Sequence, residues 1–259
     1  MNEAAMDAPT RVYWAPGCTS CLRTKEFLRK QGVPFVPVNV AADPGAMDEL
    51  RALGARSVPV VARGDRYVYA QTLKQVREFL GLPAQDDETL DPQTLVDRVN
   101  IVLPAAMRYV RQMSDDVLDG PFRNSWAPPR GLAHHVFRIV EAFLEARATP
   151  EPLTNELIMQ GTHEVLPGQD VAGYGERVLQ RFNQWWAAQD DRTCSAVMPT
   201  YYGDQTVHQV LERTTWHSAQ HTRQLMVVLE SLGIPIDRPL TVADLRGLPL
   251  PEKAWDDER

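Results

Sequence analysis

The sequence predicts two domains of different fold class, a small α/β domain followed by an all-α four-helix bundle. Short β-rich runs alternate with helical segments as far as Pro83. A polar, acidic stretch without periodicity follows, and beyond it the apolar residues recur only at helical spacing. The chain of 259 residues is long enough for two domains. We therefore place the α/β domain at residues 1–84, a linker at 85–91, and the bundle with a C-terminal tail at 92–259.

The N-terminal domain is predicted to hold seven elements in the order βαβαββα. Four short β-rich runs predict strands: residues 10–15, 34–40, 57–62 and 65–70. Three segments that stop at a glycine predict helices: residues 17–32, 45–54 and 71–81. Arg63 and Gly64 separate the last two strands as a hairpin turn does. A string of this kind is typical of one small domain with a mixed sheet.

Four long helices are predicted in the second domain, at about residues 92–118, 130–147, 170–189 and 205–232. Asp91 is a good N-cap for the first of them, and Pro92 suits its first helical position. The first helix carries an apolar stripe at helical spacing, made of Leu95, Val99, Val102, Leu103, Met107 and Val110. No strand signal of comparable strength appears, so an antiparallel four-helix bundle is the economical solution.

Net charge and the distribution of apolar residues limit the class of protein that the sequence can encode. The net charge is +3 over residues 1–85 and −10 over residues 86–259, which together make −7. The acidic second half argues against nucleic acid as a partner. No signal-peptide layout or membrane-length apolar run is evident, so we expect a cytoplasmic protein without a membrane partner. The oligomeric state stays open, with a homodimer as one candidate.

Cys18 and Cys21 form a C-x-x-C between a predicted strand and the helix that it opens. A helix N-terminus offers unpaired N–H groups and partial positive charge, which stabilise a thiolate. We expect Cys18 to be the exposed nucleophile and Cys21 the buried resolving thiol. The alternative is half of a structural zinc site, but its only candidate partners, His217 and His221, lie nearly 200 residues away. Cys194 is expected to be a buried structural thiol.

The turn at Val58–Pro59 is the second feature of this domain. A cis peptide there would present the Val58 backbone to an extended thiol substrate. With the dithiol, the segment "YWAPGC" and the element order, this turn resembles the glutaredoxin family and its mycoredoxin-like relatives over residues 10–83. The resemblance implies a thioredoxin-type fold, with Cys18 as nucleophile, Cys21 as resolving cysteine, and glutathione or a similar thiol as partner.

Glutaredoxins usually carry a Gly-x-Asp-like turn after the last strand, which holds the ends of glutathione. In this chain Tyr69-Ala70-Gln71-Thr72 stands in that place. We therefore take Gln71 and Thr72, together with Val58 and Pro59, as the candidate thiol-binding residues.

The helix at 205–232 carries two histidines that could share a metal ion. His217 and His221 lie four residues apart on one helical face, so their imidazoles can converge. Ser218 stands where the H-E-x-x-H motif of metalloproteases has its Glu, which excludes that class. His208 is about half a turn out of phase with the pair, and His163 falls in a predicted loop.

A third ligand is available in the helix at 130–147, where His134 and His135 are adjacent. Neighbouring residues point about 100° apart on a helix, so only one of the two faces the bundle core. His135 runs in phase with Ile139 and Ala142, whereas His134 runs with the more polar Arg138 and Glu141. We choose His135, because bundles commonly build sites from inward-pointing side chains of facing helices.

These residues resemble the DinB-like family, which includes the bacillithiol transferases and, more distantly, the mycothiol-dependent maleylpyruvate isomerases. The likeness rests on one histidine early in the second helix, on H-x-x-x-H followed by Arg-Gln-Leu, and on "LESLGIP", and covers residues 92–240. The resemblance implies a divalent metal held by His135, His217 and His221, with open positions left for water or substrate. It does not distinguish zinc, nickel, iron and manganese.

Together the two resemblances predict a metal-dependent transferase or isomerase. It would use glutathione or a similar thiol against a small electrophile, and the glutaredoxin-like domain would reduce or deglutathionylate the thiol product. Two alternatives stay open. One is a redox or stress-response binding protein with a non-catalytic metal bundle, and the other is a glutathione-dependent disulfide oxidoreductase with a structural bundle.

Overall fold

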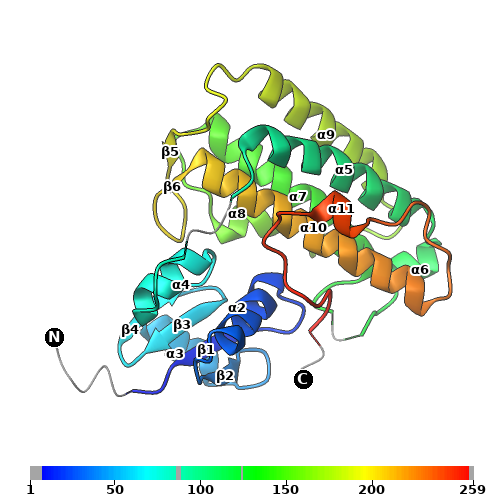
Figure 1. Cartoon of the computed structure of the whole chain (residues 1–259). Coiled ribbons are helices and arrows are strands. Elements are labelled where there is room, and N and C mark those ends of the chain that lie inside the picture. Colours follow the sequence, from blue (N-terminus) through cyan, green and yellow to red (C-terminus); the bar gives the residue numbers. More distant parts are fainter. Residues whose placement is uncertain (1–7, 86–88, 124, 257–259) are drawn as a thin grey trace. The chain divides into compact units, whose positions relative to one another are not determined.

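The computed structural model describes residues 8–85, 89–123 and 125–256 (Figure 1). They form two compact units, the first made of residues 8–85 and 251–256 and the second of residues 89–250. The end of the chain was expected to belong to the bundle as its tail, whereas residues 251–256 group with the first unit. The predicted linker falls partly on residues 86–88, which lie outside the described residues.

A four-stranded mixed sheet, in the order β2-β1-β3-β4, forms the centre of the first unit. Central β1 pairs in parallel with β2 and antiparallel with β3, and β3 pairs antiparallel with β4. The strands are β1 (Arg11–Trp14), β2 (Val36–Asn39), β3 (Val60–Arg63) and β4 (Arg66–Tyr69). The helices are α2 (Thr19–Lys30), α3 (Ala46–Ala52) and α4 (Leu73–Leu80). The predicted βαβαββα order and thioredoxin-like sheet are therefore confirmed.

Side-chain alternation along β1 gives this sheet two buried faces. Val12 packs with Leu28 of α2 and Val76 of α4. The next residue, Tyr13, points to the other face and packs with Leu50 of α3. Helices therefore cover both faces, and the end of β1 leads directly into the loop that carries the dithiol.

The second unit contains the predicted bundle of four long helices (Figure 1). They are α5 (Pro92–Arg111), α7 (Pro129–Ala148), α9 (Val171–Ala187) and α10 (Val207–Ser231). Both α9 and α10 pack against α5 and against α7. The first helix is shorter than predicted, because the chain is extended at Ser114 before the separate short helix α6 (Asp115–Asp119) begins. Among the described residues, no helix is long and apolar enough to cross a membrane.

Three short features outside the four long helices were not predicted. They are α8 (Asn155–Met159), α11 (Val242–Leu245) and the ribbon of β5 (Val197–Met198) with β6 (Gln205–Thr206). Strands of two residues are too short to show an alternating pattern. The ribbon leads into α10, where Thr206 and Gln209 form a capping box. The helix that carries the histidine pair therefore has a well-defined start.

Candidate functional sites: a dithiol and a buried histidine cluster

Cys18 and Cys21 form a disulfide at the N-terminus of α2. Cys18 is half-buried, whereas Cys21 has no exposed surface. The Cys18 sulfur caps the helix by accepting a hydrogen bond from the Cys21 backbone N–H at 3.2 Å. After reduction, the same N–H and the positive end of the helix would stabilise a thiolate at Cys18. The accessible sulfur is thus the one suited to attack, and the buried sulfur the one suited to close the disulfide.

The four predicted thiol-binding residues lie in two adjoining segments. The peptide between Val58 and Pro59 is cis, and the Pro59 carbonyl accepts a hydrogen bond at 2.9 Å from the N–H of Ala70, next to Gln71. Gln71 is only 2% exposed, and the Thr72 hydroxyl caps α4. Thr72 therefore has a structural role in this fold, Gln71 is buried, and the part of both residues in thiol binding stays a prediction.

In the bundle, His135, His217 and His221 bring three nitrogen atoms within 4.8 Å of one another. His135 comes from α7, whereas the other two come from successive turns of α10. All three are buried, with 2%, 8% and 2% of their surfaces exposed in that order. The cluster found in the described ranges consists of these three histidines, so its donor set is three imidazoles. Three protein nitrogens with a further open position are typical of catalytic zinc and related divalent sites.

Hydrogen bonding settles which nitrogen of His221 faces the cluster. Its Nδ1 lies 2.7 Å from the side-chain oxygen of Gln224. An amide oxygen only accepts, so Nδ1 carries the ring proton and Nε2 presents a lone pair. That Nε2 lies 3.1 Å from Nε2 of His217. A second partner that fixes the ring proton in this way is typical of metal-ligating histidines, so the residues fit a divalent cation.

A hydrogen bond between α7 and α10 fixes the position of His135 along α7 relative to His217 along α10. The Ser218 hydroxyl donates to the Val136 carbonyl at 2.9 Å. Ser218 follows His217 in α10, and Val136 follows His135 in α7. Ser218, which excluded the metalloprotease motif in the sequence, therefore ties together the two elements that form the cluster.

Burial keeps two histidines of the cluster in the neutral form that binds metal. Loss of solvent around His135 holds its pKa well below the usual value, and the nearby His221 and Arg213 lower it further. Burial also lowers the pKa of His221 to about 4, although its bond to Gln224 acts in the opposite direction. Both rings are thus neutral at pH 7, with lone pairs available for a cation.

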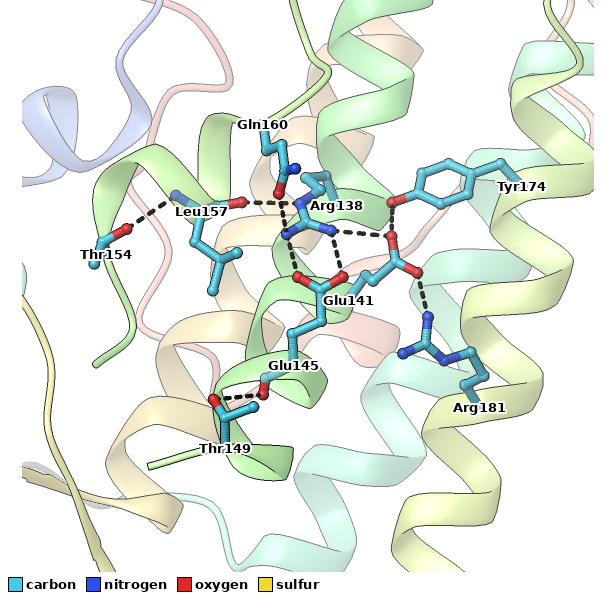
Figure 2. Close-up of polar contacts among 9 residues, drawn as sticks. All are labelled: Arg138, Glu141, Glu145, Thr149, Thr154, Leu157, Gln160, Tyr174 and Arg181. Atoms are coloured by element: carbon cyan, nitrogen blue, oxygen red, sulfur yellow. Dashed lines mark hydrogen bonds and ion pairs between the residues drawn. The ribbon is translucent and has the colours of Figure 1, made fainter. Parts of the chain in front are cut away.

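His134, the alternative to His135, lies in a different environment. Its ring stacks on Tyr174 of α9, with centroids 4.8 Å apart, and His134 is not part of the three-histidine cluster. The Tyr174 hydroxyl donates to the Glu141 carboxylate at 2.5 Å. Glu141 also pairs with Arg138 at 3.1 Å and with Arg181, as Figure 2 shows. The polar face that the sequence assigned to His134 is therefore a network that packs α7 against α9.

Trp126 and His163 extend the cluster toward the surface. The Trp126 ring centroid lies 5.2 Å from that of His135 and 6.3 Å from that of His221. On the same indole, His163 makes an edge contact at 5.4 Å and is exposed. His163 is thus an accessible imidazole separated from the buried cluster by one aromatic ring.

Comparison with known proteins concerns the N-terminal unit first. A family model described as Glutaredoxin matches residues 11–68. A glutaredoxin-like 8.6 kDa protein of Clostridium pasteurianum is 42% identical over 52 residues, 20% of this chain and 69% of that protein. The glutaredoxin-like protein NrdH of Salmonella typhimurium is 43% identical over 54 residues, 21% of this chain and 67% of that protein. The chain belongs to the glutaredoxin family through its N-terminal unit.

Two further similarities differ in what they cover. The gene 56 protein of Mycobacterium phage L5 is 46% identical over 88 residues, 34% of this chain and 77% of that protein. Among solved structures, YfiT from Bacillus subtilis is described as a probable metal-dependent hydrolase with an unusual four-helix bundle topology. It covers 60% of this chain and 96% of its own, with 14% identity and a TM-score of 0.46. So weak a likeness assigns no function to the bundle attached to the glutaredoxin unit.

The sequence missed several residues that shape these sites. Gln224 follows His221 at i+3, a spacing that could have pointed to it. Trp126 lies in a loop and carries no periodic signal. Cys194 is buried as expected, and burial raises the pKa of its thiol. In the glutaredoxin unit, Lys25 is a buried cation on the helix that carries the dithiol, and the sequence pattern had not singled it out.

Proposed function

We propose that this protein is a two-part thiol enzyme. Its bundle would be a metal-dependent transferase or isomerase that directs a small thiol, with glutathione as the leading candidate, against a small electrophile. Its glutaredoxin unit would be the oxidoreductase that returns oxidised forms of the same thiol to the reduced state. The observation that carries the proposal is the convergence of three buried imidazoles, two of which point Nε2 atoms at each other across 3.1 Å.

His135, His217 and His221 would hold the cation in the bundle. A divalent cation supplies one chemical advantage there, since it favours the deprotonated form of a thiol at neutral pH. Gln224 keeps the proton of His221 on the far side of the ring, and Ser218 keeps α10 in register with α7. Trp126 would shield the reacting sulfur from water at one side of the cluster.

The glutaredoxin unit would act on the mixed disulfides of that thiol. The Cys18 thiolate attacks the sulfur of the small thiol in the mixed disulfide, and the other sulfur leaves and takes up a proton. The Cys21 thiol then loses a proton and attacks Cys18, which releases the small thiol and forms the Cys18–Cys21 disulfide. Two electrons pass from the dithiol to the substrate disulfide, and an external thiol or reductase restores the dithiol.

Tethering explains why one chain would carry both activities. Two sites joined by a short connection meet at effective concentrations in the millimolar range. The thiol that the glutaredoxin unit releases would thus be formed near the site that uses it. Two electrophile chemistries fit the proposal: displacement of a leaving group, and addition of the thiol across a conjugated double bond.

A panel assay with matched variants tests the metal-dependent half. Metal content would be measured by plasma mass spectrometry, and thiol-dependent loss of electrophile would be followed with glutathione and other small thiols. We expect about one divalent ion per chain and loss of both metal and activity in the His217→Ala, His221→Ala variant. His208→Ala is the control, because His208 bonds the Leu90 carbonyl outside the cluster. Full activity in the double variant would contradict the proposal.

Cobalt substitution separates the enzyme from the two alternatives. If glutathione shifts the visible spectrum of the cobalt protein, the thiol reaches the metal directly. A spectrum that does not respond to any thiol favours a binding module. If Cys18→Ser abolishes all activity while metal removal leaves reductase turnover unchanged, the bundle is structural and the protein is a disulfide oxidoreductase.

A further inference from the structure

The last described residues of the chain complete the glutaredoxin unit. We call residues 251–256 the C-terminal strap, and it groups with the first unit although the whole bundle separates the two in sequence. The Glu26 carboxylate of α2 accepts hydrogen bonds from the backbone N–H groups of Glu252, at 2.6 Å, and Lys253, at 3.2 Å. One residue earlier in α2, the Lys25 ammonium pairs with the Asp256 carboxylate at 2.6 Å. Two consecutive residues of the dithiol helix therefore hold both ends of the strap.

The ion pair is deeply buried. The Lys25 side chain has no exposed surface, and that of Asp256 is 6% exposed. The Lys25 nitrogen also lies 3.5 Å from the centroid of the Trp14 ring, within the range of a cation–π contact. A buried ammonium is costly unless a counter-charge meets it. In this unit the strap supplies that counter-charge through Asp256.

The position of Lys25 relates the pair to the dithiol. Lys25 follows Cys21 by four residues and Cys18 by seven, so all three share one face of α2. Side chains four apart on a helix have Cβ atoms about 5–6 Å apart. Trp14, which contacts the ammonium, is the last residue of β1 before the loop that leads to Cys18. A positive charge is thus held on the cysteine face of the helix, beside the entrance to the dithiol loop.

We propose that Asp256 is a positioning residue for the dithiol, acting through Lys25. The carboxylate anchors the ammonium on the cysteine face of α2, where its charge stabilises the Cys18 thiolate and so favours the reduced dithiol. The inference rests on the proposed oxidoreductase function of the glutaredoxin unit. It adds a residue from the far end of the chain, which no glutaredoxin pattern within residues 11–68 contains.

The test measures a property of the disulfide itself in the full-length protein. Equilibration with reduced and oxidised dithiothreitol, followed by trapping of free thiols, yields the equilibrium constant for forming the Cys18–Cys21 disulfide. In Asp256→Asn the ammonium loses its anchor and turns away from the cysteine face, so the disulfide should become more favourable, by roughly three- to tenfold. An ammonium that stayed in place would shift the constant in the opposite direction, because the variant also removes a negative charge. Lys25→Met should shift the constant in the same direction. Iodoacetamide should alkylate Cys18 of both reduced variants more slowly at pH 7.

Four further variants keep the proposal falsifiable. Asp256→Glu retains the charge and should restore the wild-type constant at least in part. The double variant Lys25→Met, Asp256→Leu removes both charges, so no unpaired charge is left buried and the protein should still fold. Its equilibrium constant should match that of Lys25→Met alone. Lys253→Gln is the control, because the strap uses the backbone of this exposed residue. Glu26→Gln tests whether the backbone contacts contribute independently of the ion pair.

The result that would overturn the proposal is a disulfide that is equally favourable or less favourable in folded Asp256→Asn than in the wild type. A lower melting temperature with the same constant would show that the strap is only structural. Failure of the proposed function has a different signature, since wild-type protein would then lack reductase turnover whatever its disulfide constant.

Discussion

At the residue scale, the histidine cluster depends on side chains that are not ligands. Gln224 fixes the ring proton of His221, and Ser218 bonds to the α7 backbone beside His135. Gln224 determines which nitrogen of His221 presents a lone pair, and Ser218 holds α10 against α7. The cluster therefore depends on side chains beyond its three histidines.

Replacing Gln224 with Leu should weaken metal binding. The Nδ1 proton of His221 would lose its acceptor, so the ring would no longer be held in the tautomer that presents Nε2. We expect a loss of about 10–100-fold in affinity, as for other partners of metal-bound histidines. Competition with a chromophoric chelator measures the metal affinity of each variant. Gln224→Glu retains the acceptor and serves as the control, and equal affinity in both variants would exclude this role.

Acid should destabilise the metal-free protein in a defined range. A histidine has a pKa of about 6.5 in the unfolded chain, whereas the folded value is about 4 for His221 and is also lowered for His135. The unfolded state therefore binds more protons between about pH 6.5 and 4, and the free energy of unfolding should fall by roughly 1–3 kcal/mol as the pH falls through that window.

Urea unfolding of the apoprotein across this pH range measures the effect. The variant His221→Gln should show a shallower decline than the wild type, because it lacks one of the two groups. Parallel curves for the two proteins would mean that other groups control the acid response.

At the element scale, the packing of α7 decides which of two adjacent histidines joins the cluster. One face of α7 meets α10 through Val136, and another meets α9 and α8 through Arg138. Arg138 bonds the Leu157 carbonyl at 2.8 Å and pairs with Glu145 at 2.5 Å, as drawn in Figure 2. These contacts fix the rotation of the helix, which places His135 inward.

Arg138→Met should destabilise the bundle substantially. Its side chain is 6% exposed, and its loss would leave the half-buried Glu141 and Glu145 without their shared cation. We expect the free energy of unfolding to fall by about 2–4 kcal/mol. The matched control is Arg181→Met, since Arg181 pairs with the same Glu141 but is 49% exposed. Its expected loss is within about 1 kcal/mol, so similar losses in urea unfolding would contradict this account.

A close contact between α7 and α9 depends on Gly175. A Cβ atom at this position would lie 2.6 Å from a ring carbon of Phe137, which is fully buried. Gly175→Ala should therefore cost about 1–3 kcal/mol of stability despite the better helix propensity of Ala. Thermal unfolding measures this loss, and a stabilised variant would show that Phe137 can move away freely.

At the scale of the whole molecule, the chain leaves the glutaredoxin unit, forms the bundle, and returns to the glutaredoxin unit for its last described residues. The bundle is thus connected at both ends to the unit that carries the dithiol. Either unit can be perturbed separately, because the histidine cluster lies wholly in one and the dithiol wholly in the other.

Metal removal should therefore affect the bundle alone. A ligand present at 100 times its dissociation constant stabilises the folded state by about 2.7 kcal/mol. We expect a chelator to lower the melting temperature of the bundle in the wild type and to leave the His217→Ala, His221→Ala variant unchanged. The dithiothreitol equilibrium of the disulfide should be the same with and without metal. A shift in that equilibrium would indicate that the two sites are coupled.

The amino-acid sequence was sufficient to predict the order of the sheet strands and long helices, the two-part architecture and the candidate site residues. Local patterns suffice for these: glycine stops, β-rich runs, a C-x-x-C at a helix start, and an i, i+4 histidine pair. The choice of His135 also followed from helical phase, because the apolar face of α7 is encoded in its own residues.

The contacts that complete the sites, most of them between residues that lie far apart in the sequence, became evident only in the folded protein. No periodic pattern in the sequence marks the groups that make these contacts. The contacts are the hydrogen bond that fixes the proton of His221, the bond from Ser218 to α7, the ring of Trp126 beside the cluster, and the pairing of Lys25 with Asp256. A buried charge is tolerated only where its partner lies within bonding distance. In the glutaredoxin unit that partner lies 231 positions along the chain, since Lys25 is paired with Asp256, and no local pattern could have joined them.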